Sequence, residues 1–363
     1  MSKSIIRAAK GDIPADLVLK NGKVLNVFTE EIYAADVAIT GNTIVGVGNY
    51  KGEQEIDCTG KYIVPGFIDA HVHIESSMVT PLEFSKHIVR TGTTGIIADP
   101  HEIVNVNGKK GLDFILDASE DVPVNTYVMI PSSVPATEID TNGAGKFLAE
   151  DMLPYKANPR VLGFGEMMRF VDVLNEQRET LDKLDAFSDM IIDGHAPGIT
   201  GKDVQAYRAA GVMDDHECAT AEEGLEKLRA GFCILVREGS GARNLESLLK
   251  GFLEAGVSLE QCMFCTDDKH LEDIEKEGHI NACIRKAIAI GVPAVKAYKM
   301  ASFNAARAYQ INNAGAIGPG RLADIVVVGD LSKAEPSFVI KGGKIVDEEW
   351  LESFHYELKD ESD

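Results

Sequence analysis

Short apolar segments broken by turn residues occupy both ends of the chain. The dipeptides Asn21-Gly22 and Gly41-Asn42 interrupt such segments near the N-terminus. The same pattern of short apolar segments and turn residues occurs again from residue 323 onward. Glycine and asparagine between apolar strands are typical of β-hairpins. The pattern therefore predicts one small β-sandwich domain, formed by residues 1–62 together with residues 314–347.

The middle of the chain alternates strand-like and helix-like segments. Amphipathic stretches such as 220–230 and 244–255 separate apolar runs that have the length of buried strands. The eight strand candidates are Ile63–His71, Thr94–Asp99, Val124–Ile130, Val161–Glu166, Met190–Gly194, Gly211–Asp215, Phe232–Arg237 and Cys262–Asp267. Eight β-then-α units predict an α/β fold, with a (β/α)₈ TIM-like barrel over residues 63–313. Functional side chains of such barrels lie at the C-terminal ends of the strands.

Composition narrows the classes of partner. The 363 residues include 36 basic and 57 acidic side chains, which gives a formal net charge of −21. Such a charge repels nucleic acids and anionic membranes, so we expect neither as a partner. The N-terminus has no apolar stretch of signal-peptide length, and no segment approaches the roughly 20 apolar residues of a membrane span. These features predict a cytoplasmic protein, and residues 348–363 indicate a disordered acidic tail.

Six cysteines are scattered without the spacing of a disulfide framework. Cys262 and Cys265 lie in one apolar run, and no second cysteine pair accompanies them. A zinc knuckle is therefore not predicted. We expect buried thiols in a reducing compartment.

The tripeptide His71-Val72-His73 ends the first strand candidate. Residues i and i+2 of a strand point to the same side, so both imidazoles leave the strand end together, as two ligands of one metal would. Four further ligand-type residues end later strand candidates, and these are Glu166, His195, His216 and Asp267. Imidazoles and carboxylates suit divalent zinc, manganese or iron. Six ligands exceed the needs of one tetrahedral ion, whereas two ions that share a carboxylate would use them all.

The chain resembles the amidohydrolase superfamily of metal-dependent hydrolases and, within it, the adenine deaminases. The stretches that carry the resemblance are PGFIDAHVHIESS (65–77), DPHEI (99–103), GEMM (165–168), DGHAPG (193–198), DHEC (215–218), REGS (237–240) and CTDDKH (265–270). The His-x-His pair and Asp267 are typical of the superfamily as a whole. The ESS, GEMM and DGHAPG stretches are more specific to adenine deaminases, and the likeness covers residues 15–347.

The resemblance implies a ligand set and a reaction. His71 and His73 would bind one metal together with Asp267, His195 and His216 would bind the second, and Glu166 would bridge the two. Manganese or iron is the expected metal, with zinc as the alternative. The implied reaction is the hydrolytic deamination of adenine to hypoxanthine and ammonia, in a protein expected to be a homodimer.

The same resemblance suggests roles around the metals. Asp267 would take a proton from the attacking water and pass it to the departing amine. Glu75 and His101 are candidates for protonating a ring nitrogen, and hydrogen bonding to a metal ligand is the alternative role of both. His270 could contact the substrate, and the base edge could be recognised by Arg237, Glu238 and Ser240.

Two other classes of function stay open. The same barrel could hydrolyse a cyclic amide or an N-acyl substrate, or it could bind metal or a partner without catalysis. The non-catalytic class is disfavoured because burying six polar ligands without metal would be costly. Adenine deaminases also carry a further domain after the barrel, and we expect that domain to be absent from this chain of 363 residues.

Overall fold

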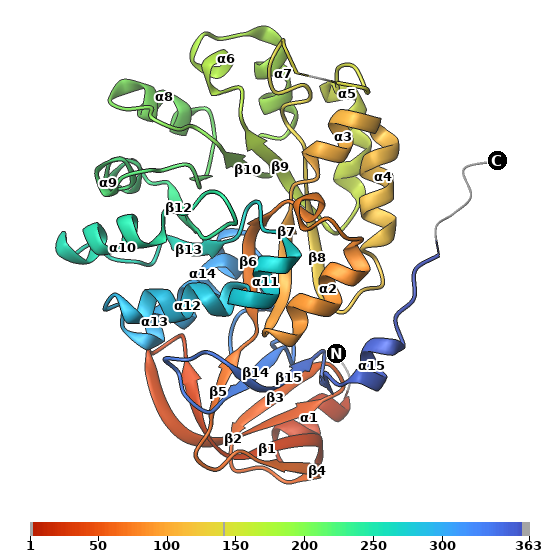
Figure 1. The fold of residues 1–363 in the computed structure, drawn as a ribbon. Helices are drawn as coiled ribbons and strands as arrows, with labels where there is room; N and C mark the ends of the chain where they lie inside the picture. The colour runs from red at the N-terminus through yellow and green to blue at the C-terminus, as the bar shows by residue number, and fades with distance from the viewer. Residues whose placement is uncertain (1–2, 141, 358–363) are drawn as a thin grey trace.

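The computed structural model describes residues 3–140 and 142–357, which form a β domain and an α/β part (Figure 1). The β domain draws its strands from both chain ends and lies at the bottom of the view. Its elements are α1 (Lys3–Ala9), β1 (Ala15–Asn26), β2 (Glu31–Thr40), β3 (Thr43–Gly48), β4 (Gly52–Asp57), β5 (Tyr62–Pro65), β14 (Ile325–Val328), β15 (Pro336–Lys341), β16 (Lys344–Ile345) and α15 (Glu348–Glu352).

The strands of the β domain form one eight-stranded sheet in the order β16-β15-β14-β5-β1-β2-β3, with β4 paired to β1. Strands from both chain ends thus belong to one hydrogen-bonded sheet, and the division into domains and the β-sandwich stay predictions. The Gly41-Asn42 turn joins β2 to β3 as expected. Asn21-Gly22 differs, because β1 runs through it with a shift of register and Asn21 has a positive φ of 60°. That dipeptide is a bulge within a strand and not a hairpin turn.

The α/β part carries eight parallel strands surrounded by most of the helices (Figure 1). Its strands are β6 (Phe67–Val72), β7 (Thr93–Ala98), β8 (Asn125–Ile130), β9 (Val161–Met167), β10 (Ile191–Gly194), β11 (Asp214–Asp215), β12 (Cys233–Arg237) and β13 (Cys262–Cys265). Its helices are η1 (Ile74–Ser77), α2 (Pro81–Arg90), α3 (His101–Asn107), α4 (Lys109–Ala118), α5 (Ala149–Met152), η2 (Leu153–Ala157), α6 (Phe170–Leu174), α7 (Arg178–Ala186), α8 (Lys202–Ala209), α9 (Ala221–Arg229), α10 (Leu245–Glu254), α11 (Leu271–Glu277), α12 (Ile280–Ala289), α13 (Ala294–Met300) and α14 (Phe303–Ala308).

The parallel strands form a five-stranded sheet, β10-β9-β8-β7-β6, and a three-stranded sheet, β11-β12-β13. Backbone hydrogen bonds link the edges of the two sheets. Met213 N donates to Ile192 O between the strands β10 and β11, over 2.8 Å, and Asp267 N donates to His71 O beyond the end of β13, over 2.9 Å. The sheet is thus curled, and the C-terminal ends of its strands lie on one side.

The first strand candidate is divided between the two parts of the molecule. Residues 62–65 form β5 in the β domain, and residues 67–72 form β6 in the α/β part. Pro65 has no N–H to donate, and a Cβ on Gly66 would collide with the side chain of Thr94. The prediction of one continuous strand over Ile63–His71 is therefore wrong at Pro65-Gly66.

One hydrophobic core joins both parts. It contains Leu25 and Val326 of the β domain and Phe84 and Val104 of the α/β part. The helices present apolar stripes to it, and two of them, α2 and α9, begin with a threonine cap. Thr80 Oγ1 accepts from Glu83 N at the start of α2, and Thr220 Oγ1 accepts from Glu223 N at the start of α9.

The C-terminal segment differs from the expected tail in its first half. Residues 348–352 form α15, in which Leu351 is buried because it packs against the core. Residues 358–363 of the predicted acidic tail lie outside the described residues. All six cysteines are free thiols, five of them buried. Within residues 3–140 and 142–357, no helix has the length and apolarity needed to cross a membrane.

Candidate metal centre

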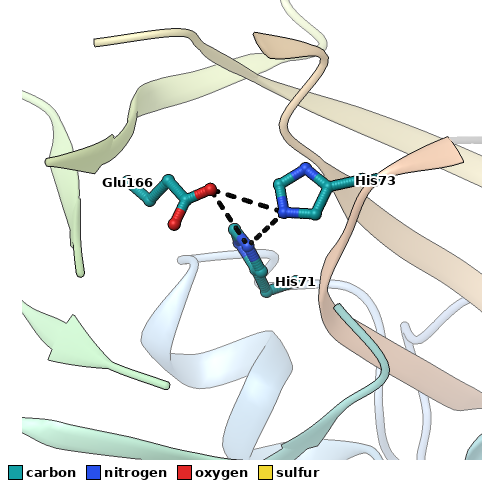
Figure 2. Close-up of side chains that lie close together, drawn as sticks. All are labelled: His71, His73 and Glu166. Carbon is teal, nitrogen blue, oxygen red and sulfur yellow. Dashed lines mark hydrogen bonds and ion pairs between the residues drawn. The ribbon is translucent and has the colours of Figure 1, made fainter. Parts of the chain in front are cut away.

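The C-terminal ends of the parallel strands bring the six predicted ligands together. His71 lies in β6 and His73 directly follows it, and their Nε2 atoms are 3.2 Å apart (Figure 2). Asp267 Oδ1 lies 3.6 Å from His71 Nε2 and 3.0 Å from His73 Nε2. We call His71, His73 and Asp267 the first ligand group. All three side chains are buried, as ligands of an enclosed ion would be.

The second ligand group consists of His195, after β10, and His216, after β11. Glu166, in β9, lies between the two groups. Its Oε1 is 3.4 Å from His73 Nε2 in the first group (Figure 2). Its Oε2 is 2.5 Å from His195 Nδ1 and 3.2 Å from His216 Nε2. One carboxylate thus offers a separate oxygen to each group, which is the arrangement that a shared ligand of two ions requires.

Backbone contacts fix the position of these ligands. Asp267 has a left-handed backbone with φ of 56°, and its N donates to His71 O while its carbonyl accepts from His73 N. The strand therefore ends at the point where Asp267 turns toward the histidine pair. His73 Nδ1 donates to the Asp99 carbonyl over 2.8 Å, which leaves the lone pair on Nε2 for a metal. Asp99 Oδ2 also accepts from Glu166 N over 2.9 Å.

The charges of the cluster keep its carboxylates ionised. Burial would raise the pKa of Asp267, but the neighbouring imidazoles, His73 first among them, hold that pKa well below its usual range. Burial likewise opposes ionisation of Glu166, and hydrogen bonds from His101, His195 and His216 outweigh it and lower the pKa. Burial lowers the pKa of His71, and the neighbouring His216 and His73 lower it further.

The donor set fits divalent metal ions. The ligand atoms of His71, His73 and Glu166 lie within 4.8 Å of one another, as do those of Glu166, His195 and His216. Among the described residues, the Nδ1 atoms of His71 and His216 are buried without a hydrogen-bond partner. The Nε2 atoms of the same two rings face the carboxylates of the cluster, His71 Nε2 at 3.6 Å from Asp267 Oδ1 and His216 Nε2 at 3.2 Å from Glu166 Oε2. Imidazole and carboxylate ligands in this number suit zinc, manganese or iron.

The structure places two of the predicted catalytic residues beside this cluster. His101 Nδ1 lies 3.2 Å from Glu166 Oε1. Glu75 Oε1 accepts from Ile103 N over 3.3 Å, and its Oε2 is buried without a partner among the described residues. Burial and the negative charge of Glu102 raise the pKa of Glu75 to about 7. Glu75 can therefore exchange a proton near neutral pH. A cavity of 380 Å³ opens beside His101, lined also by Glu102, Ser133 and Asp140.

Of the four remaining predicted site residues, Arg237 ends β12, and the other three lie in the connections after β12 and β13. Arg237 contacts the cluster directly, because its guanidinium donates to Asp267 Oδ2 over 2.7 Å. Glu238 pairs with Lys286 over 2.6 Å, and Ser240 Oγ donates to Asp273 over 2.5 Å. His270 is exposed, and its Nδ1 donates to the Ser76 carbonyl over 2.8 Å. The polar groups of Glu238, Ser240 and His270 thus bond to other groups of the protein, and their substrate roles stay predictions.

Sequence reasoning gave no role to Glu217, Glu102 or Asp99. Glu217 Oε1 lies 3.4 Å from His216 Nε2 and also pairs with Arg237. Glu102 lies 3.6 Å from His73 Nδ1 and 3.5 Å from His101 Nε2. Both glutamates directly follow a histidine of the quoted motifs. This adjacency could have indicated that both glutamates lie at the site, because a residue next to a histidine at a strand end lies in the same loop.

Imidazoles and carboxylates thus meet at the strand ends of a curled parallel sheet, which makes this cluster a candidate metal centre in a protein of the α/β class. The model of the amidohydrolase family matches residues 62–346, and the chain belongs to this family.

The curated relatives narrow the comparison. The chain is similar to the adenine deaminase of Desulfitobacterium hafniense (strain Y51), with 48% identity over 347 residues, which is 96% of this chain and 61% of that protein. It is also similar to the adenine deaminase of Clostridium acetobutylicum, with 46% identity over 94% of this chain and 60% of that protein. The chain thus spans about 60% of the length of these relatives.

Solved structures support the fold. The β-aspartyl dipeptidase of Fervidobacterium islandicum AW-1 superposes with a TM-score of 0.63 at 20% identity, covering 91% of this chain and 96% of that one. The atrazine chlorohydrolase of Arthrobacter aurescens TC1, solved with zinc, superposes with a TM-score of 0.61 at 14% identity, covering 93% and 98%. At these identities the likeness concerns the fold alone.

Proposed function

We propose that this chain catalyses the hydrolytic deamination of adenine to hypoxanthine and ammonia. The observation that carries the metal-dependent part is Glu166, whose two carboxylate oxygens face two separate groups of buried ligands. The choice of adenine comes from the likeness to adenine deaminases over almost the whole chain. We further propose that the two parallel sheets form a (β/α)₈ barrel. The homodimer and the cytoplasmic location stay predictions from the sequence.

In this proposal the first ligand group, Glu166 and the second ligand group would hold two divalent ions, manganese or iron, with zinc as the alternative. Bound there, such ions would supply the Lewis acidity that lowers the pKa of water and makes it nucleophilic near neutral pH. The enclosed position of the ligands would keep other water away. This part of the proposal explains why so many ligand-type side chains are buried together.

The side chains around the ligands would move the protons of the reaction. Asp267 would accept a proton from the attacking water and deliver it to the leaving amine, and Arg237 holds its other oxygen in place. Glu75, with a pKa of about 7, would protonate a ring nitrogen as C6 becomes tetrahedral. His101 would help to orient Glu166 or the base.

Ammonia release by the 363-residue chain, reconstituted with manganese or iron, tests the proposal. Adenine, adenosine, cytosine and hydantoin are the compounds to compare. We expect turnover of adenine, with hypoxanthine as the second product, and none of adenosine, because ribose on N9 would have to enter the same enclosed site. Opening of the hydantoin ring releases no ammonia and is followed instead by the loss of hydantoin itself; turnover of hydantoin alone would favour a cyclic amide substrate. Two bound ions without turnover of any compound would favour a binding protein.

A further inference from the structure

The two loops that carry the second ligand group are joined by a cluster of charged side chains with little exposed surface. We call Asp215, Glu223 and Lys227 the loop anchor. Asp215 precedes His216, whereas Glu223 and Lys227 belong to α9. Lys227 and Asp215 have no exposed surface, and their charged atoms are 3.2 Å apart. Burying a lysine ammonium is costly unless it is paired, so a fully buried Lys227 is expected to have a structural or functional role.

Each carboxylate of the loop anchor bonds to both loops. Asp215 accepts from Ala196 N over 2.9 Å and from Glu217 N over 2.7 Å. Glu223 accepts from Gly198 N over 2.9 Å and from Ala219 N over 3.0 Å. The residues directly after His195 and directly after His216 are thus held by the same acid.

Lys227 lies between the two carboxylates and completes the connection. Its Nζ donates to the Ala196 carbonyl over 2.8 Å and to Glu223 over 2.9 Å, in addition to the ion pair with Asp215. Burial lowers the pKa of Lys227, but Asp215 outweighs this effect and raises it, so the ammonium stays charged. Without the positive charge of Lys227, the carboxylates of Asp215 and Glu223 would lie close together with no cation between them.

We propose that Lys227 is a positioning residue that sets the spacing of His195 and His216 and thereby controls affinity for one of the two ions only. The first ligand group depends on other contacts, those of Asp69, Thr266 and the Asp267 backbone. The inference rests on the two-ion centre of the proposed function and is independent of the substrate. Loss of groups that orient metal ligands typically lowers metal affinity about 10- to 100-fold.

The test is a manganese titration of the metal-free chain, followed by elemental analysis and electron paramagnetic resonance. In the unchanged chain, two bound ions that share Glu166 give an exchange-coupled signal. In Lys227→Met we expect one ion to bind with unchanged affinity and the second about 10- to 100-fold more weakly, so that an isolated manganese signal replaces the coupled one. Asp215→Asn keeps the side-chain volume and tests the same anchor if Lys227→Met does not fold.

Lys299→Met is the matched control. Lys299 is also buried and pairs with two acids, Glu30 at 2.8 Å and Glu260 at 2.6 Å, but it contacts neither loop of the second ligand group. This variant should bind both ions as the unchanged chain does. Equal weakening of both ions in Lys227→Met, or normal binding of both, would overturn the role of Lys227. Fewer than two ions in the unchanged chain would overturn the two-ion centre itself.

Discussion

Asp267 combines two tasks that one substitution can separate. Its Oδ1 faces His73 and its Oδ2 accepts from Arg237. We expect Asp267→Asn to keep the fold but to lower turnover about 10²- to 10⁴-fold, because the amide cannot accept the proton of the attacking water. The measurement is kcat for adenine with the metal content determined in the same sample. Near-normal turnover at full metal occupancy would contradict the proton-transfer role.

Lys183 is expected to make the free energy of unfolding depend on pH. Burial lowers its pKa to about 8 from 10.5, and its Nζ donates to the Ser132 carbonyl over 3.1 Å. Between these two pH values the unfolded chain binds more protons at this site than the folded chain does. The contribution of Lys183 to the free energy of unfolding therefore rises with pH across that window, by at most about 1.4 kcal/mol per pH unit.

The comparison of Lys183→Met with the unchanged chain measures this contribution. Urea unfolding at several pH values between 7 and 10.5 should show the unchanged chain gaining stability relative to the variant as pH rises. Lys296→Met, which removes an exposed lysine, corrects for the altered net charge. A difference between Lys183→Met and the unchanged chain that does not vary with pH would show that the folded pKa is not lowered.

At the scale of elements, one buried network fixes the junction of β6 and β13. Asp69 Oδ1 accepts from the N–H groups of His71 and Thr266, and its Oδ2 lies 3.1 Å from His279 Nε2. His279 Nδ1 lies 2.9 Å from Thr93 Oγ1 of β7. Helix α12, which begins directly after His279, is thereby attached to the middle of β6, to the start of β7 and to the residue that follows β13.

We expect His279→Leu to lower the free energy of unfolding by about 1–3 kcal/mol, because buried Asp69 and Thr93 lose a hydrogen-bond partner. Urea denaturation followed by circular dichroism measures the change. His87→Leu is the control, since His87 on α2 is partly exposed and pairs with the exposed Glu275. That control should stay within about 0.5 kcal/mol of the unchanged chain. Equal losses in the two variants would count against the network.

The sequence predicted most elements because their patterns are local. All eight strand candidates contain a strand, and the expected helices 220–230 and 244–255 correspond to α9 and α10. The convergence of the six proposed ligands could be predicted because each of them ends or directly follows an apolar run. The break at Pro65-Gly66 was missed, since both neighbours are apolar and only the close approach of Thr94 shows why the chain turns.

The contacts that hold the ligands could not be predicted in the same way. The pair of Asp69 with His279 and the link of Ala196 to Lys227 join residues that are distant in sequence. No periodicity indicates which buried acid meets which base. The same limit applies to Glu217, whose contact with His216 and Arg237 depends on how two loops fold over each other.

At the scale of the whole molecule, the β domain and the α/β part are expected to unfold together. They share one core, and a polar cluster also joins them: Lys341 Nζ bonds to Asp324 over 3.1 Å and to Asn125, at the start of β8, over 3.0 Å. We expect Lys341→Met to lower the free energy of unfolding by about 1–3 kcal/mol, because Asp324 stays buried with fewer partners.

Calorimetry and urea unfolding test both statements. A single cooperative transition should appear in the unchanged chain and in Lys341→Met, displaced to lower temperature in the variant. Lys344→Met, at an exposed position of the adjacent β16, should leave the transition in place. Two separate transitions in the unchanged chain would show that the parts fold independently.

The construction of the β domain from both chain ends has a consequence for biosynthesis. Strand β5 has β1 on one side and β14 on the other, with Val64 opposite Val326. On the ribosome β5 emerges early, whereas its second neighbour follows only after the entire α/β part. Until then one edge of β5 offers unpaired N–H and C=O groups to other nascent chains. The long interval between the two partners makes closure of this sheet a late event, and the newly made protein is most vulnerable to aggregation before that event.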